Sequence, residues 1–277
     1  MTINSSAFFQ FFKYTVYVLL AMNVYWFFDE ETAAATLQFS NGVDAADLIE
    51  AFSATIDTAA WVVLLLMFEL ETFVLEDQQF TKPVTWSLHG LRALCYLFIV
   101  YAFYGYIQNL TFLYETTALA GVTDLCSLLP DQWSWAVTLD EYADITASNC
   151  AAFSDTSAFY QFKDMAAVVD SEGLKEIRYL AWLDVINAAV WLLVVLVLEI
   201  DVRLQEHNRF EGLALKSSNA AKVLLYALLF LAAVYWGLKG DFVDFWDAFL
   251  WLVAFVFIEL NVFEWRQEDQ EAEAVNT

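Results

Sequence analysis

Three glutamates lie inside long apolar stretches of this sequence, where a carboxylate is costly and therefore informative. Glu69, Glu199 and Glu259 each follow a run of almost entirely hydrophobic residues. A carboxylate at mid-depth in a bilayer costs about 3 kcal/mol on insertion scales, so three of them need compensation. Such acids can bind a cation, relay a proton or pair with a basic side chain. Burial favours the neutral carboxyl and a nearby cation favours the carboxylate, so the sequence leaves their charge open.

The three glutamates belong to one signature that recurs at identical spacing. A polar residue is followed four positions later by Trp, then by Glu eight beyond the Trp, and by a second polar residue two beyond the Glu. The three copies are Asp57, Trp61, Glu69 and Glu71; Asn187, Trp191, Glu199 and Asp201; and Asp247, Trp251, Glu259 and Asn261. At about 100° per residue the polar groups share one side of a helix, which leaves an apolar side for lipid.

We therefore take the acids of the signature as candidates for an ion or proton pathway. They are Glu69, Glu199, Glu259, Asp57, Asp247, Glu71 and Asp201. The three tryptophans are large enough to fill the spaces between helices, and we expect them to be packing residues.

A second pattern precedes each copy of the signature, a basic residue followed four positions later by Tyr. Its members are Lys13 with Tyr17, Arg92 with Tyr96, and Lys222 with Tyr226. We expect the basic groups and the Tyr hydroxyls to pair with the glutamates and fix helix register. Two alternatives remain open. The glutamates could converge to conduct a cation or proton, or they could line a substrate or lipid-headgroup pocket.

Membrane-spanning helices must position these residues. The 277 residues are 60% hydrophobic and 18% aromatic, which is more apolar surface than a soluble domain of this size can bury. Windows long enough to cross about 30 Å of hydrocarbon predict six spans. They are Phe11–Phe28, Asp57–Val74, Leu91–Ile107, Tyr179–Ile200, Lys222–Leu238 and Phe245–Trp265. The expected fold is an all-α polytopic membrane protein of three tandem, pseudo-threefold helical hairpins.

The hairpins are predicted at residues 1–78, 79–205 and 206–277, with connections of very different length. The first connection is an acidic insertion over about 29–56, and the second, 109–178, is a small extracytoplasmic cap. Cys126 and Cys150 lie in this cap, and a disulfide between them would stabilise it by about 3 kcal/mol. Residues after about 264 form an acidic tail.

The distribution of Lys and Arg predicts the orientation. With the N-terminus in the cytoplasm, the basic residues on the inner side are Lys13, Lys82, Arg92, Arg203, Arg209, Lys216, Lys222 and Arg266. Those on the outer side are Lys163, Lys175, Arg178 and Lys239. The positive-inside rule thus favours a plasma (inner) membrane protein with both termini in the cytoplasm.

Composition and absent motifs narrow the function. The net charge of −24 without a clustered basic surface argues against nucleic acid as a partner. The sequence has no phosphate-binding glycine loop, nucleophile elbow, H-E-x-x-H motif or zinc-type cysteine pairs, so we expect no catalytic residue and no metal site. The sequence leaves any cofactor unknown. We expect a non-enzymatic membrane protein that conducts or couples to a cation or proton. The alternative is a structural or assembly subunit whose acids are internal ion-pair staples and whose segment 109–178 binds a protein partner.

Overall fold

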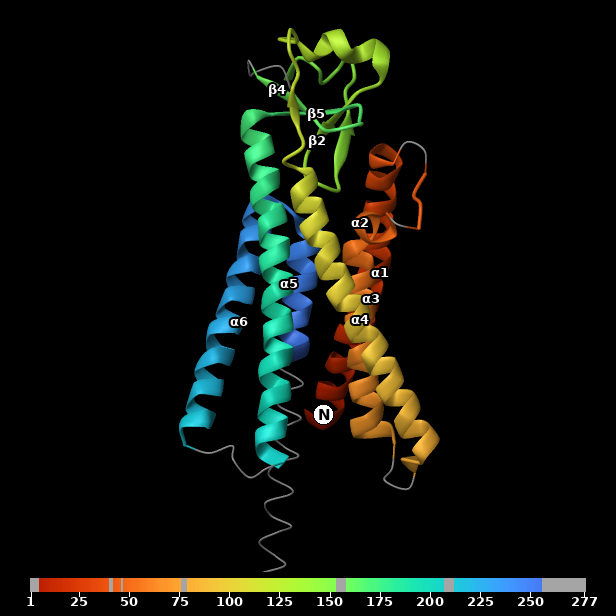
Figure 1. Ribbon diagram of the computed structural model, residues 1–277, viewed down its shortest axis with the longest axis vertical. Coiled ribbons are helices and arrows are strands. Elements are labelled where there is room, and N and C mark those ends of the chain that lie inside the picture. The colour runs from red at the N-terminus through yellow and green to blue at the C-terminus, as the bar shows by residue number, and fades with distance from the viewer. Residues whose placement is uncertain are drawn as a thin grey trace, which may run out of the picture. The chain divides into compact units, whose positions relative to one another are not determined.

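The computed structural model describes residues 5–39, 42–45, 47–75, 79–152, 158–206 and 212–255 (Figure 1). Within this part, five helical stretches are long and apolar enough to cross a membrane. They are Phe9–Gln38, Ser53–Val74, Lys82–Phe112, Ser171–Asp201 and Leu213–Lys239. Each of the first five predicted spans lies within one of them. The chain thus has the helices of a multi-pass integral membrane protein, which is the class that its fold defines.

Long helices make up most of the described part. In chain order the helical elements are α1 (Ser5–Gln38), α2 (Leu48–Ala51), α3 (Ser53–Glu69), the π-helical turn η1 (Leu70–Val74), α4 (Lys82–Phe112), α5 (Ser171–Glu206) and α6 (Leu213–Lys239). Residues 242–255 are also helical. The predicted sixth span begins in this last segment, and its remainder to Trp265 lies outside the described residues.

Local sequence explains several helix boundaries. Pro83 stands in the first turn of α4, where its missing N–H costs nothing. The Asp170 carboxylate accepts a hydrogen bond of 2.6 Å from the Gly173 backbone N–H and caps α5. Gly240 ends α6 with a φ of 86°, a left-handed conformation that glycine adopts without strain. The turn between α6 and the helical residues 242–255 is consequently short.

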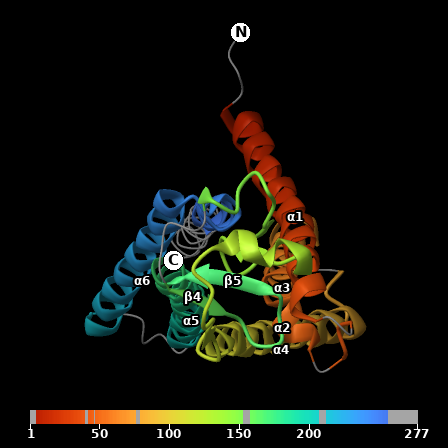
Figure 2. The same ribbon diagram turned by 90° about the horizontal axis from the view of Figure 1, so that it is seen from above.

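The chain divides into two compact units, Val24–Ala189 and Met1–Asn23 with Val190–Thr277. In the first unit α2 and α3 pack alongside α4 (Figure 2). Gly105 of α4 permits the close approach, because a Cβ atom there would lie 2.5 Å from the Ile49 carbonyl oxygen and 2.9 Å from the Ser53 Cβ. Backbone contact through a small residue is a usual way for helices to pack in membranes.

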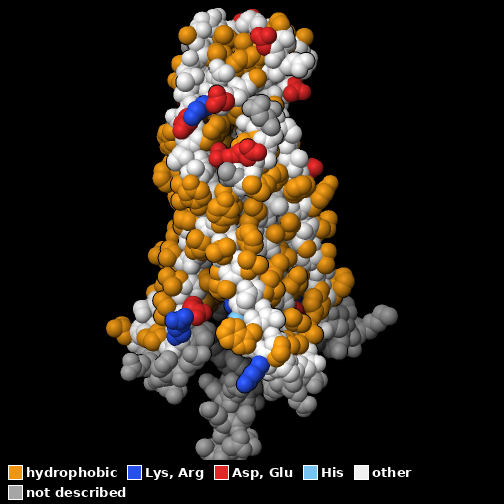
Figure 3. Space-filling model, turned by 45° about the vertical axis from the view of Figure 1, so that its right-hand side comes forward, with side chains coloured by type: hydrophobic (Ala, Val, Ile, Leu, Met, Phe, Trp, Pro, Cys, Tyr) orange, Lys and Arg blue, Asp and Glu red, His pale blue; other side chains and the backbone are white. Residues whose placement is uncertain are grey.

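Hydrophobic side chains cover the helical surface that is visible in Figure 3, and acidic side chains are visible over the cap. On α4 the exposed apolar side chains include Leu94, Leu97, Phe98 and Tyr101. Apolar side chains with this exposure need lipid rather than water as their solvent. The surface therefore agrees with the membrane assignment.

The cap between α4 and α5 contains a five-stranded sheet, and here the all-α expectation was wrong. The strands are β1 (Thr117–Ala118), β2 (Ser134–Ala136), β3 (Tyr142–Asp144), β4 (Phe159–Gln161) and β5 (Ala167–Asp170). They are arranged in the order β1-β4-β5-β2-β3. The β2–β5 pair is parallel, and the other neighbours in this order are antiparallel. Strands of two to four residues are too short to show the alternation by which a strand is recognised in sequence.

The sheet carries a hydrophobic core on each face. Ala167 and Val169 of β5 pack with Phe162, which follows β4, and with Leu113 and Ile177 at the ends of α4 and α5. Val168, which points the opposite way, packs in a second cluster with Leu125 and Phe159. The cap is therefore a folded β-domain joined to the helices through one of its two cores.

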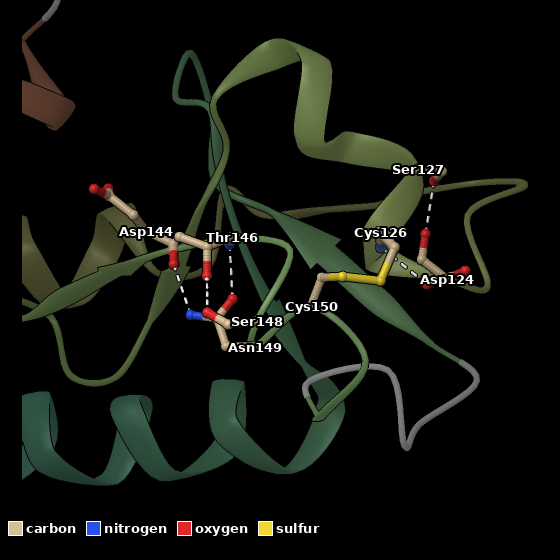
Figure 4. Close-up of a disulfide and its surroundings, with 8 residues drawn as sticks. All are labelled: Asp124, Cys126, Ser127, Asp144, Thr146, Ser148, Asn149 and Cys150. Atoms are coloured by element: carbon tan, nitrogen blue, oxygen red, sulfur yellow. Dashed lines mark hydrogen bonds between the residues drawn. A yellow bond between two sulfur atoms is a disulfide. The ribbon is translucent and has the colours of Figure 1, made fainter.

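The predicted disulfide between Cys126 and Cys150 is confirmed (Figure 4). Cys126 lies in the 3₁₀ helix η3 (Leu125–Asp131), and its N–H donates a hydrogen bond of 2.9 Å to the Asp124 carboxylate. Beside Cys150, the Asn149 amide donates to the Asp144 carbonyl oxygen over 2.9 Å. The bridge ties η3 to the turn after β3 and closes the second core.

Gly105→Ala should destabilise the helical part of the first unit. The added Cβ would overlap the Ile49 carbonyl oxygen, and overpacking of this kind costs about 1–3 kcal/mol. Gly90→Ala on the same helix is the matched control, because its Cβ would meet no atom within 4 Å. Thermal unfolding in detergent should give a lower midpoint for Gly105→Ala and an unchanged or higher one for Gly90→Ala. Equal midpoints would contradict this packing.

Cys126→Ser should loosen the cap and leave the helices intact. Loss of a bridge across 24 residues removes about 3 kcal/mol from the stability of the closed loop. Proteinase K should therefore cut within 113–170 faster in Cys126→Ser than in the wild type. Cys95→Ala, which removes the free buried thiol of α4, serves as the control and should leave the cleavage rate unchanged.

Candidate functional site

The polar side chains buried between helices form the candidate site, and Glu31 is one that the sequence did not reveal. Its carboxylate, only 4% exposed, accepts hydrogen bonds from the Ala54 N–H (2.7 Å), the Thr55 N–H (3.0 Å) and the Thr55 hydroxyl (2.6 Å). These N–H groups belong to the first turn of α3, where no intrahelical acceptor is available. Glu31 thus caps α3 from α1. This residue falls in the acidic insertion predicted over about 29–56, whereas in the structure it lies on α1, which continues to Gln38.

Further polar contacts join α3 to α4. The Asn109 amide donates to the Ser53 hydroxyl over 3.1 Å. The Tyr106 hydroxyl donates to the Asp57 carboxylate over 3.4 Å. Asp57, the first polar residue of the signature, is therefore engaged by the neighbouring helix. Hydrogen bonds of this kind fix the register of two packed helices.

Arg92 meets the second acid of the signature. Its guanidinium lies 2.6 Å from the Glu71 carboxylate, and the two side chains are 37% and 25% exposed. Glu71 sits in η1, the π-helical continuation of α3. In an uninterrupted α-helix the side chains of Glu69 and Glu71 would point about 160° apart, so this pair does not share one side of the helix as expected from the sequence. The wider π turn changes the direction of the residues after Leu70. Glu69 itself is buried at 5% exposure.

The other unit contains an equivalent pair. Lys222 of α6 lies 3.1 Å from the Asp201 carboxylate of α5, and the side chains are only 14% and 4% exposed. The Ser218 hydroxyl, one turn before Lys222, donates to the same carboxylate oxygen over 2.7 Å. Asp201 occupies the same place in the signature as Glu71, two residues after the glutamate. In both units the basic residue of the second pattern thus meets this second acid.

The glutamates of the signature have different surroundings. Glu199 is exposed, and its carboxylate lies 3.0 Å from Arg203 one turn later on α5. Glu69 is buried instead, and Glu259 lies outside the described residues. Lys13 is buried at 3% exposure with its ammonium group 5.0 Å from the centre of the Tyr14 ring. The described glutamates therefore do not repeat one local environment.

The aromatic members of the two patterns also differ in their surroundings. Trp191 and Trp251 are buried with their ring centres 6.4 Å apart, and the Phe255 ring lies 4.6 Å from Trp191. Tyr226 approaches Phe255 at 6.3 Å. Tyr17 is buried, Tyr96 is exposed and Trp61 is half-buried. Trp191 and Trp251 thus lie in an aromatic cluster with Phe255.

In the third copy of the signature, the Trp four positions after the first polar residue is a hydrogen-bond donor to it. The Trp251 indole N–H donates to the Asp247 carboxyl one helical turn earlier. The Asn23 amide of α1, which is 0% exposed, donates to the same carboxyl over 2.8 Å. The spacing therefore places a donor beside the acid on its own helix.

Three groups outside the spans have shifted pKa values. Burial raises the pKa of the Tyr142 phenol, against a hydrogen bond from Gln38 at the end of α1. Burial, together with the charges of Asp47 and Glu115, raises the pKa of the Glu50 carboxyl. A hydrogen bond to Glu115 raises the pKa of the exposed Lys163 ammonium. The charges of nearby acids thus contribute to the raised pKa values of Glu50 and Lys163.

No group of three or more His, Cys, Asp or Glu side chains within the described residues could hold a metal ion. His89 contacts the Thr85 carbonyl oxygen of its own helix at 2.7 Å, and His207 lies outside the described residues. No protein-family model, curated protein or solved structure matches this chain. The assignment to the class of multi-pass membrane proteins is therefore based on the apolar helices. The description of the candidate site is based on the contacts between its side chains.

Lys222→Met should strongly destabilise its unit. Removing one partner leaves the Asp201 carboxylate buried without a cation, a change that typically costs about 3–5 kcal/mol. The double variant Lys222→Met with Asp201→Leu should recover most of the loss, because no buried charge remains. The measurement is the unfolding midpoint in detergent.

Arg203→Gln is the matched control for this prediction. The Glu199–Arg203 pair is exposed, and such pairs contribute about 0–1 kcal/mol. Its midpoint should stay close to that of the wild type. A loss as large as that of Lys222→Met would contradict the distinction between buried and exposed pairs.

Proposed function

We propose that this protein is a structural or assembly subunit of a membrane complex, in which the intramembrane acids join its helices and the cap binds a protein partner. The observation that carries the proposal is the pair of equivalent ion pairs, Glu71–Arg92 and Asp201–Lys222. In each pair a basic side chain neutralises a carboxylate that an ion pathway would need for binding the ion. Polar pairs between helices serve as attachment points in membrane proteins.

We infer that the chain is built from three tandem hairpins with six spans. The contacts support this, because the signature helix of each hairpin reaches the first helix of the next one. Asp57 and Glu71 contact α4, and Asp201 contacts α6. Asp247 contacts Asn23 of α1, so the third hairpin reaches the first. In this proposal residues 242–255 begin a sixth span that ends near Trp265.

The cap is the part of the molecule that we assign to partner binding. Residues 113–170 contain nine Asp and Glu residues and one Lys. Two cores and a disulfide make this segment rigid enough to present a fixed surface. Its charge would favour a partner with a basic surface. Following the distribution of Lys and Arg, we place the cap outside the plasma membrane and both termini inside.

Conduction of a cation or proton through Glu69, Glu199 and Glu259 is the second candidate. The burial of Glu69 favours it, since acids buried in membranes often mark ion paths. The exposure of Glu199 and its pairing with Arg203 speak against a set of three equivalent glutamates. The two candidates predict different behaviour in liposomes.

The first test is co-purification from native membranes in mild detergent. The wild type should carry a stoichiometric partner that dissociates at high salt, because electrostatic contacts are screened. Asp131→Lys with Glu141→Lys, two exposed cap positions, should abolish this association. Asp131→Glu with Glu141→Asp keeps the charge and should retain it. Purification of a native complex that the charge reversal leaves unchanged would overturn the role assigned to the cap, and purification of the protein alone would overturn the subunit proposal.

The second test measures proton and alkali-cation flux into liposomes that contain the purified protein. The subunit proposal predicts flux no greater than that of empty liposomes. Flux that disappears in the combined variant Glu69→Gln, Glu199→Gln and Glu259→Gln would overturn it in favour of conduction.

A further inference from the structure

The contact between Asn23 and Asp247 leaves one strong acceptor without a donor. Asn23 is 0% exposed and donates its amide N–H to the Asp247 carboxyl over 2.8 Å. Its own carbonyl oxygen, Oδ1, has no hydrogen-bond partner among the described residues. A buried amide oxygen in this state costs about 1–3 kcal/mol, so a donor is expected beside it.

The carboxyl beside this amide lies among neutral groups. Among the described residues its hydrogen-bond donors are the Asn23 amide and the Trp251 indole, and neither carries a charge. Asp201 in the same unit shows the contrasting arrangement, because it is paired with Lys222 and also accepts from Ser218. An ionised carboxylate without a cation is disfavoured in such surroundings, where a proton neutralises it instead.

A proton on Asp247 would complete the hydrogen bonding of both side chains. A carboxyl group and a primary amide each offer one donor and one acceptor side by side. The Asn23 N–H already donates to one oxygen of Asp247. In the neutral acid the second oxygen carries an O–H, which is the donor that Asn23 Oδ1 lacks. One proton therefore removes the charge on the half-buried carboxyl and the unpartnered acceptor of Asn23 together.

The repeat gives independent support. In the second hairpin the position equivalent to Asp247 is Asn187, a neutral amide of nearly the same shape as a protonated Asp. Its side chain is half-buried as well. The same place in the signature thus accepts a group that cannot ionise.

We propose that Asp247 and Asn23 form a proton-binding site, in which the neutral Asp247 carboxyl and the Asn23 amide are joined by two hydrogen bonds. The bound species is a proton, taken up from water onto one carboxyl oxygen without any other covalent change. The site does not depend on the proposed subunit function, because a subunit and a proton-coupled protein could both contain it. A result that contradicts this proton site would leave the evidence for the ion pairs and for the role of the cap unchanged.

Infrared spectroscopy of the full-length protein in lipid nanodiscs at neutral pH tests the proposal. The wild type should show a carbonyl band of a protonated carboxyl that shifts in D₂O, and Asp247→Asn should lose it. Asn23→Leu should keep the band at a higher frequency, because both hydrogen bonds between the carboxyl and Asn23 are gone. Glu199→Gln is the matched control and should leave the band unchanged, since Glu199 is exposed and paired with Arg203.

A measurement on the unaltered chain covers the case in which Asp247→Asn does not fold. Incorporation of ¹³C-carboxyl aspartate into the wild type should shift the same band, whereas labelled glutamate should not. Loss of carboxylate absorption in Asp247→Asn, with no change in the protonated-carboxyl region, would overturn the proposal. That result would mean that Asp247 is ionised and that a bound water donates to Asn23. An aspartate-labelled wild type without a shifted band would overturn it equally.

Discussion

A polar group carried into hydrocarbon must find its partner inside the protein, and this requirement organises the helical part of the molecule. Water cannot compensate a carboxylate, an amide or a helix end there. Glu31 is satisfied by the first turn of α3, Glu71 by Arg92, and Asp201 by Lys222 and Ser218. Each of these contacts joins two different helices. Because buried polar groups need partners, they form specific contacts between helices. These contacts fix the position of one helix along another, which apolar packing alone would not do.

The cap is stabilised by other means because it meets a different solvent. It has a sheet with a hydrophobic core on each face, and the disulfide closes the second core, which contains Val168 and Leu125. Its surface is acidic, which suits an aqueous environment. The end of α1 also contributes, since Gln38 donates to the Leu139 carbonyl oxygen and to the Tyr142 hydroxyl. The helices and the cap therefore share contacts within their unit, and the cap is not a loosely tethered loop.

The acids of the signature divide into those with a cation and those without one. Glu71 and Asp201 face basic side chains, and this supports a structural role for them. Within the described part of the chain Asp247 receives neutral donors, Asn23 and Trp251, and this supports the proton site. The same pattern of polar residue, Trp and acid thus places chemically different groups at corresponding points. A repeat preserves positions along a helix, whereas the function at each position depends on the residue that occupies it.

The sequence by itself determined the membrane environment, five of the helical spans and the two cysteines of the bridge. These follow from local properties, namely the length and hydropathy of each stretch and the placement of the cysteines in one polar insertion. It also singled out Arg92, Lys222 and the signature acids as groups that need partners. Which acid meets which base was decided only by the tertiary structure, because it depends on the π turn after Glu69 and on the neighbouring helix. The sheet of the cap and the capping of α3 by Glu31 could likewise not be predicted from the sequence. Very short strands carry no period, and a contact from α1 to α3 leaves no spacing that a linear pattern could reveal.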